Sequence, residues 1–339
     1  MDAPATDRVE VPPSRRPEVS TAMPSVRPKP IILYVVLAYA LAWLVALPLW
    51  IGGRGLGDPL FTVYALVMMF TPTVAALLVA RFAETPDSRP GGPGIASSLG
   101  LWPLKPAGPF IAFLAAGLLL PILLVLGGLL LGAALGVYPA DFANLTALRT
   151  IMAQQAPQAA AQLDALPAGL LIAGQLFNVL IGSFVNLVPA LGEEIGWRGW
   201  LVSRLEPLGA TATVLVSRVV WGLWHAPLIL LGYNYPGVPG RLGLLAMMGM
   251  TISFGAVFAW LRLASGSVWP AALAHGALNA AAGLFLVFAA TTDLDMLVVA
   301  PLGWTGWILP IVLAGLLLWK RPRPDHTPRN TAGHGQGHP

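Results

Sequence analysis

Long apolar runs alternate with short polar segments along most of this 339-residue chain. A transmembrane helix needs about 20 consecutive, mainly apolar residues. Runs of this length predict eight membrane-spanning helices, at residues 31–51, 59–81, 107–137, 168–190, 211–232, 242–261, 267–289 and 296–319. The pattern is that of an all-α, polytopic membrane protein.

The two ends of the chain lack this apolar pattern. Residues 1–30 are rich in Pro and Arg, and residues 320–339 are polar, so both are expected to be disordered tails. The first apolar run begins too late and is too long for a signal peptide. One transmembrane domain, residues 31–319, is expected between the tails.

Composition excludes several classes of protein. The chain is 56% hydrophobic and only 10% charged, whereas soluble domains carry about 25% charged residues. It has no cysteine, so it forms no disulfide, thiolate metal site or cysteine nucleophile. The basic residues are dispersed and lack interleaved aromatics, so no nucleic-acid partner is expected.

The distribution of Lys and Arg predicts the orientation in the membrane. Most of the 19 basic residues fall in the tails and in loops on the same side as the tails. The opposite loops hold only Arg54, Arg149 and Arg241, and Arg218 lies within a span. Because positive loops stay inside, both termini are expected to be cytoplasmic, with the protein in the cell membrane.

Ionisable groups at membrane depth gather between residues 193 and 279. Each costs about 2.5–3.5 kcal/mol on insertion scales, which makes them functional candidates. In "LGEEIGWRGWL", Glu193 and Glu194 point about 100° apart on a helix, while Arg198 lies four residues after Glu194 and is placed to pair with it. Glu193 is then free to act as a base; a solvated charge cluster at the membrane surface is the alternative.

Two later segments add polar groups to this set. In "SRVVWGLWHAP", Arg218, Trp221 and His225 share one helix face, and in "AHGALNA", His275 and Asn279 share another. Each segment alone is compatible with simple interhelical hydrogen bonding. With Glu193, however, they supply a general base, its orienting partner and two oxyanion donors, which is a set for hydrolysing an amide with an activated water.

Other protease signatures do not fit. Neither G-x-S-x-G nor H-E-x-x-H occurs. The "GLGD" of residues 55–58 matches the G-x-G-D of intramembrane aspartyl proteases, but it falls in a short loop and no second aspartate lies in any predicted span.

The order EExxxR, aromatic-xxx-His and HxxxN on late membrane helices resembles the CAAX protease and bacteriocin-processing (CPBP, or Abi) family. The resemblance covers about residues 165–290. It implies a hydrolase of the intramembrane protease class, related to the prenyl-protein CAAX endopeptidases.

The resemblance also implies roles for individual residues. Glu193 and His225 would activate the water, and His275 and Asn279 would form the oxyanion site. Glu194 and Arg198 would support them.

Two further points depend on the resemblance. Trp221 stands where the family usually has Phe. The family is commonly described as metalloproteases, so one zinc ion held by Glu193, His225 and His275 is one interpretation; a metal-free glutamate mechanism is equally allowed.

Polar residues also interrupt the fourth apolar run. Gln175, Asn178 and Asn186 fall on broadly one helix face, which we expect to line an interior cavity next to Glu193. Interhelical hydrogen bonding is the alternative explanation.

The expected function is that of an endopeptidase of CAAX prenyl-protease type, which acts in the lipid bilayer on a membrane-associated or lipidated protein or peptide. The alternative is a non-proteolytic scaffold, or a bacteriocin-immunity protein that uses the same cavity for binding. A transporter is disfavoured because no internal repeat is visible.

Overall fold

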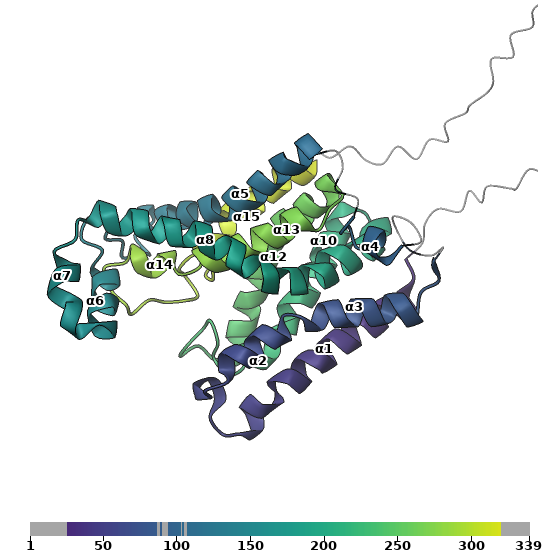
Figure 1. The fold of residues 1–339 in the computed structure, drawn as a ribbon, viewed down its shortest axis with the longest axis horizontal. Coiled ribbons are helices and arrows are strands. Elements are labelled where there is room, and N and C mark those ends of the chain that lie inside the picture. Colours follow the sequence, from purple (N-terminus) through teal and green to yellow (C-terminus); the bar gives the residue numbers. More distant parts are fainter. Residues whose placement is uncertain (1–25, 87–88, 90–93, 103, 105–106, 320–339) are drawn as a thin grey trace, which may run out of the picture.

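The computed structural model describes residues 26–86, 89, 94–102, 104 and 107–319, and the protein is helical throughout this part (Figure 1). Most of the predicted tails, residues 1–25 and 320–339, lie outside the described residues. The longer helices are α1 (Pro28–Ile51), α2 (Phe61–Met68), α3 (Thr71–Phe82), α5 (Ala107–Ala134), α6 (Thr146–Gln155), α8 (Ala168–Glu194), α10 (Ala210–Trp224), α12 (Gly240–Ser265), α13 (Trp269–Ala281) and α15 (Thr305–Trp319). The shorter ones are α4 (Ile95–Ser98), α7 (Ala160–Asp164), α9 (Val202–Leu205), α11 (Ala226–Ile229), α14 (Leu284–Val287), the π-helix η4 (Ile195–Leu201) and the single-turn η1 (Gly55–Gly57), η3 (Pro157–Ala159) and η5 (Glu206–Leu208).

Six helical runs of the described part are long and apolar enough to cross a membrane. They are Pro28–Ile51, Phe61–Phe82, Gly108–Ala134, Ala168–Leu208, Gly240–Ser265 and Trp269–Val287. Two shorter apolar helices, Ala210–Trp224 and Thr305–Leu318, lie where the other two spans are predicted. The predicted fold class, an all-α polytopic membrane protein, is therefore confirmed.

Several helix boundaries differ from the predicted ones. Helix α1 begins at Pro28, inside the predicted tail, because proline is well suited to the first turn of a helix. The fifth span ends early, at Trp224, and a separate short helix follows from Ala226 because Pro227 cannot continue the hydrogen-bond ladder. The last helix starts at Thr305 instead of residue 296, after an irregular segment.

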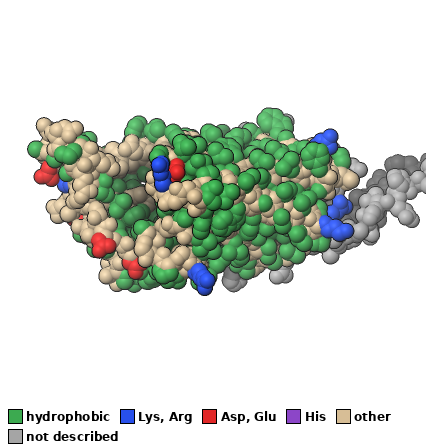
Figure 2. All heavy atoms as spheres, turned by 90° about the horizontal axis from the view of Figure 1, so that it is seen from below, with side chains coloured by type: hydrophobic (Ala, Val, Ile, Leu, Met, Phe, Trp, Pro, Cys, Tyr) green, Lys and Arg blue, Asp and Glu red, His purple; other side chains and the backbone are tan. Residues whose placement is uncertain are grey.

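Helices α12 and α13 form the centre of the molecule. In each of them, 67% of the central 18-residue window is buried, against 17–39% in the other four long runs. The outer helices turn large apolar side chains outward, such as Leu44, Phe177 and Val185. Figure 2 shows one face of the molecule, on which hydrophobic side chains cover a broad middle region and several Lys and Arg side chains gather at the right-hand end. This surface suits a bilayer.

The first and last long helices have their outer ends on the same side. In Figure 1, α1 begins and α15 finishes at the right, and the α6–α7 hairpin occupies the opposite end. A bidentate ion pair joins Arg204 to Glu84, with nitrogen–oxygen distances of 2.9 and 2.8 Å. Both side chains are largely buried, so this pair joins α9 to the segment after α3.

Helices α8 and α13 pack against each other more closely than ordinary side chains allow. A Cβ atom added to Gly276 of α13 would lie 2.6 Å from the carbonyl oxygen of Ser183 and 2.9 Å from the amide nitrogen of Leu187. Small residues at such contacts let membrane helices approach backbone to backbone. The approach matters for function because His275 is the neighbour of Gly276.

A second set of glycine contacts positions the segment that carries Glu193, Glu194 and Arg198. Gly192, Gly196 and Gly199 lie on one face of the helix, where added Cβ atoms would meet Phe70, Pro72 and the carbonyl oxygen of Leu99 at 2.8, 2.5 and 2.8 Å. Between them the helix widens into the π-helix η4, a feature that often marks functional sites. The packing of this glycine face turns Glu194 and Arg198 toward the interior.

We predict that Gly276→Ala destabilises the protein by about 1–3 kcal/mol, since the methyl group would overlap the α8 backbone. Gly174→Ala is the matched control: it lies on α8 with nothing within 4 Å of an added Cβ, and it should be neutral or stabilising by up to about 1 kcal/mol. Thermal unfolding in detergent measures both. Equal stability of the two variants would contradict the close-packing account.

Candidate active site

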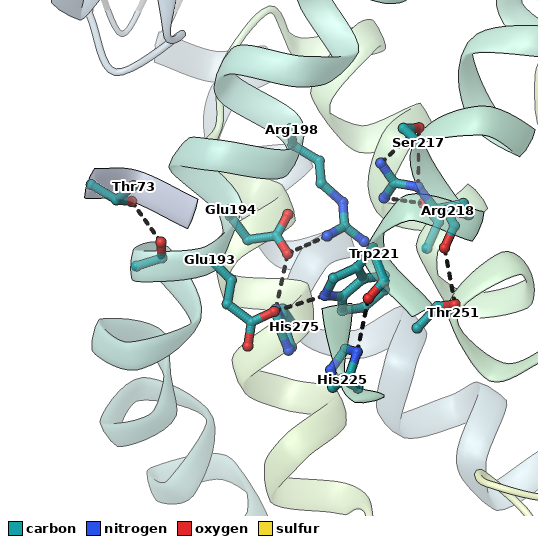
Figure 3. A network of polar contacts seen from close by, with 12 residues as sticks. Thr73, Glu193, Glu194, Arg198, Ser217, Arg218, Trp221, His225, Thr251 and His275 are labelled. Atoms are coloured by element: carbon teal, nitrogen blue, oxygen red, sulfur yellow. Dashed lines mark hydrogen bonds and ion pairs between the residues drawn. The ribbon is translucent and has the colours of Figure 1, made fainter. Parts of the chain in front are cut away.

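Three helical segments that are distant in the sequence bring the predicted polar residues together (Figure 3). The C-terminal turn of α8 supplies Glu193 and Glu194, and η4 adds Arg198. Helix α10 supplies Trp221, with His225 immediately after its last residue, and α13 supplies His275. The charged members are almost completely shielded: Glu193 is 2% exposed, His275 4%, and Glu194 and Arg198 are 0% exposed.

Glu194 is the anchor of this cluster. Its Oε1 accepts a hydrogen bond from Arg198 Nη1 at 2.6 Å, so the predicted i, i+4 ion pair is present. The same oxygen lies 2.9 Å from His275 Nδ1. The contact with His275 was not expected from the sequence, and it ties α8 to α13 at the site.

Glu193 points away from Glu194, as the helical spacing predicted, and has a different partner. Its Oε2 accepts a hydrogen bond of 2.7 Å from the indole Nε1–H of Trp221. Its Oε1 has no hydrogen-bond partner among the residues that the structure describes. One carboxylate oxygen is thus fixed, and the other remains available.

The Trp221 ring lies within a cluster of cations and aromatic rings. The Arg198 guanidinium carbon is 4.1 Å from its centroid and that of Arg218 is 5.8 Å away. A cation over the face of an indole is attracted by the ring quadrupole. It also withdraws electron density, which makes the N–H a better donor to Glu193. From the sequence, Trp221 is only an aromatic residue at a position where the family usually has Phe; its hydrogen bond to Glu193 is a functional feature that sequence reasoning missed.

His225 is the most accessible of the predicted site residues on α10. It is half-buried, its ring is 4.8 Å from that of Trp224, and its Nδ1 lies 2.9 Å from the carbonyl oxygen of Trp221. A carbonyl only accepts, so Nδ1 carries the proton and the neutral ring has its lone pair on Nε2. In Figure 3 the rings of His225 and His275 and the Glu193 carboxylate lie on the same side of the cluster.

His275 and Asn279 lie one helical turn apart on α13. The His275 ring stacks on Phe258, with centroids 5.8 Å apart, and meets Trp221 edge-on at 5.3 Å. Asn279 is exposed, and its amide has no hydrogen-bond partner within the described part of the chain. These contacts fix the imidazole plane and leave the neighbouring amide free.

Arg218 receives no carboxylate at ion-pair distance among the described residues. Its Nε and Nη2 donate to Ser217 Oγ at 3.2 and 3.0 Å, and its Nη1 donates to the carbonyl oxygen of Gly255 at 3.3 Å. Gly255 makes room for it, since an added Cβ would lie 2.4 Å from Arg218 Cδ. Arg218 therefore brings a second fully buried guanidinium group to the neighbourhood of the Trp221 ring, in addition to that of Arg198.

The arrangement of donors does not fit the zinc set that the resemblance allows. No three His, Asp or Glu side chains in the described residues come together as a group that could hold a metal ion. The three residues concerned are each engaged otherwise, Glu193 with Trp221, His225 with a backbone carbonyl and His275 with Glu194.

The polar residues predicted to line a cavity on the fourth span do so, but Glu193 is not among the residues that line it. A pocket of about 300 Å³ lies between α8 and the α13–α14 segment. Its walls are formed by Gln175, Asn178, Val179, Gly182, Asn186, Ala280, Gly283, Leu284 and Val287.

The fold and the site together define an integral membrane protein of polytopic helical type with a buried Glu/His/Arg cluster. Residues 175–281 match the family model described as "Type II CAAX prenyl endopeptidase Rce1-like". That range contains all seven predicted site residues, and the resemblance to the CPBP family is confirmed. At the level of this family the match supports an intramembrane endopeptidase. No curated protein matches the chain.

We predict that Trp221→Phe lowers kcat/KM about 10- to 100-fold, because it keeps the aromatic ring but removes a hydrogen bond to a carboxylate. Trp307→Phe is the matched control, since it also loses an indole hydrogen bond, here to the carbonyl oxygen of Leu302 at 3.0 Å, on the remote helix α15. Peptide cleavage by both purified variants measures the difference. Equal activity of the two would show that the indole N–H has no role at Glu193.

Proposed function

We propose that this protein is an intramembrane endopeptidase of CAAX prenyl-protease type that hydrolyses a peptide bond with a water activated by Glu193. The observation that carries the proposal is the unequal use of the two adjacent glutamates. Arg198 and His275 share Glu194 Oε1, and Glu194 Oε2 is fully enclosed in the interior. Glu193 is held through Oε2 by Trp221, and its Oε1 is not among the fully enclosed polar atoms.

The reaction proceeds through a tetrahedral intermediate. Glu193 accepts a proton from water while the water oxygen attacks the carbonyl carbon, and His225 Nε2 accepts the second hydrogen bond of that water and orients it. The oxyanion is stabilised by the Asn279 amide and by His275. Collapse of the intermediate breaks the C–N bond, and the proton held by Glu193 passes to the leaving amine.

The role of His275 depends on its protonation. Its Nδ1 faces the Glu194 carboxylate, so the neutral ring that donates there has no proton on Nε2. Only the imidazolium form donates to Glu194 and to an oxyanion at once. Glu194 offsets that positive charge, which explains why a carboxylate already paired with Arg198 also faces a histidine.

The mechanism we propose needs no metal ion, since the donors are separately engaged and do not form a ligand set. The substrate is a membrane-associated or lipidated protein or peptide, because the site lies within helices that present a lipid-facing surface. The end of the molecule at which α1 begins and α15 finishes faces the cytoplasm in this proposal, because Lys and Arg side chains gather there, and both termini are then cytoplasmic.

A second candidate function is that of a scaffold or immunity protein that only binds in the polar cavity. It is less well supported, because binding alone gives no reason to keep a carboxylate oxygen of Glu193, the Nε2 of His225 and the amide of Asn279 without hydrogen-bond partners among the described residues.

Substitution of the two glutamates separates catalysis from stability. We predict that Glu193→Gln abolishes cleavage of a labelled membrane proteome while the protein keeps its unfolding temperature. Glu194→Gln leaves Arg198 without its anion and should destabilise the protein by about 3–5 kcal/mol. Normal peptide cleavage by Glu193→Gln would show that Glu193 does not activate the water. If both variants lost activity and both kept their stability, the separate roles of Glu193 in catalysis and Glu194 in stability would be rejected.

The metal-free mechanism predicts that protein purified free of bound metal keeps full activity in the presence of EDTA and 1,10-phenanthroline. Metal content by mass spectrometry is the control for this assay. The metal-dependent alternative would be established if the chelators abolished activity and added zinc restored it, provided that zinc had no such effect on Glu193 and His275 variants.

A further inference from the structure

We infer that the carboxamide-lined pocket between α8 and α13–α14 binds an extended segment of the peptide substrate on one side of the bond that is cut. This inference rests on the proposed peptidase function and adds a substrate-binding subsite to it. The pocket has two unlike walls. Gln175, Asn178 and Asn186 form the polar wall on α8, and Ala280, Gly283, Leu284 and Val287 form the opposite, apolar wall.

The polar wall has unused hydrogen-bonding groups. Gln175 is half-buried and Asn178 is exposed, and neither side chain has a hydrogen-bond partner among the residues that the structure describes. Asn186 donates from Nδ2 to the carbonyl oxygen of Gly182 at 2.9 Å, which leaves its Oδ1 free. The interhelical hydrogen bonds that would make this stripe purely structural are therefore absent from the described contacts.

The chemistry of these groups selects the ligand. A carboxamide both donates and accepts, as a peptide group does, and unpaired amides are costly at membrane depth. A transmembrane helix satisfies its own backbone and leaves nothing for them to bind, and a lipid chain has no polar group at all. An extended peptide has unpaired backbone N–H and C=O groups for the polar wall, while its side chains alternate toward the apolar wall.

The polar wall of the pocket lies on the helix face that carries Glu193. Gly182, Asn186 and Glu193 follow one another at intervals of four and seven residues, so they lie on one helix face. At about 1.5 Å per residue, Asn186 is about 10 Å and Asn178 about 22 Å along α8 from Glu193. An extended peptide advances about 3.3 Å per residue. The part of the peptide next to Asn186 is therefore about three residues from the cleaved bond, and the part next to Asn178 is about seven residues from it.

The first test uses full-length protein in lipid vesicles and lipid-anchored synthetic peptides with the same cleavage site and either two or eight residues on each side of it. We expect the double variant Gln175→Leu/Asn178→Leu to lose about 4- to 100-fold in kcat/KM on the long peptide, about 2- to 10-fold per hydrogen-bonding side chain. Cleavage of the short peptide should be unchanged. Gln162→Leu, the same chemical change at an exposed position of α7, should affect neither.

The possible results discriminate clearly. Equal losses on both peptides, or no loss on either, would overturn the subsite. If wild-type protein cuts neither peptide in a Glu193-dependent way, the peptidase function itself fails, and the cross-linking test below still decides whether the pocket binds a peptide.

The second test exploits the absence of cysteine, which makes any introduced thiol unique. In the Glu193→Gln background and with copper–phenanthroline added as oxidant, Asn178→Cys should form a disulfide with peptides whose single thiol lies about seven residues from the cleavage site. It should not do so with peptides whose thiol lies two residues away. Val185→Cys, 67% exposed on the outer side of the same helix, is the control. The proposal would be overturned if no cross-link formed, or if the control cross-linked equally well. It would also be overturned if an alkyl-chain lipid probe prevented the cross-link and unlabelled peptide did not.

Discussion

The fold depends on the cost of placing charge in a dry, apolar interior. Glu194 lies at the centre of this constraint, since one of its oxygens accepts from Arg198 at 2.6 Å and lies 2.9 Å from His275. Removing one partner of such a buried pair costs about 3–5 kcal/mol, so the helices that contribute these residues cannot slide past one another. The glycine contacts of α8, η4 and α13 serve this arrangement, because a charged cluster of short bonds requires backbones that approach closely.

Local spacing predicted much of this from the sequence. Apolar runs located the helices, and the i, i+4 relation assigned Arg198 to Glu194 because both lie on one helix, whose geometry is known in advance. The hydrogen bond from Trp221 to Glu193 and the contact of His275 with Glu194 join residues 28 and 81 positions apart. Such contacts depend on how each helix is rotated about its axis, and that rotation is set by tertiary packing that no single-helix pattern contains. The π-helix is likewise a result of packing, since its glycines Gly196 and Gly199 lie against Pro72 and Leu99.

The division between the two glutamates explains how one cluster is both rigid and reactive. Glu194 stabilises the fold but is a poor base, because Arg198 and His275 hold its Oε1 and its Oε2 is fully enclosed. A carboxylate without partners would be reactive but badly oriented. Glu193 lies between these limits, since Trp221 fixes one oxygen and leaves the other toward the side where His225 is accessible. The Arg198 guanidinium packs on the Trp221 ring, so Arg198 contacts both Glu194 and the tryptophan that orients Glu193.

The same reasoning extends along α8 to the substrate. Water and an extended peptide are both excluded from a bilayer by their unpaired hydrogen-bonding groups, so a peptidase in this environment must supply partners along the whole path as well as at the cleaved bond. The carboxamides of α8 lie on the helix face that carries Glu193, and the apolar residues of α13 and α14 lie opposite. A helix with polar side chains at only these positions remains apolar enough to insert, because its outer face keeps Phe177, Ile181 and Val185 toward lipid. The polar stripe therefore stabilises an unfolded substrate at little cost to the insertion of the protein itself.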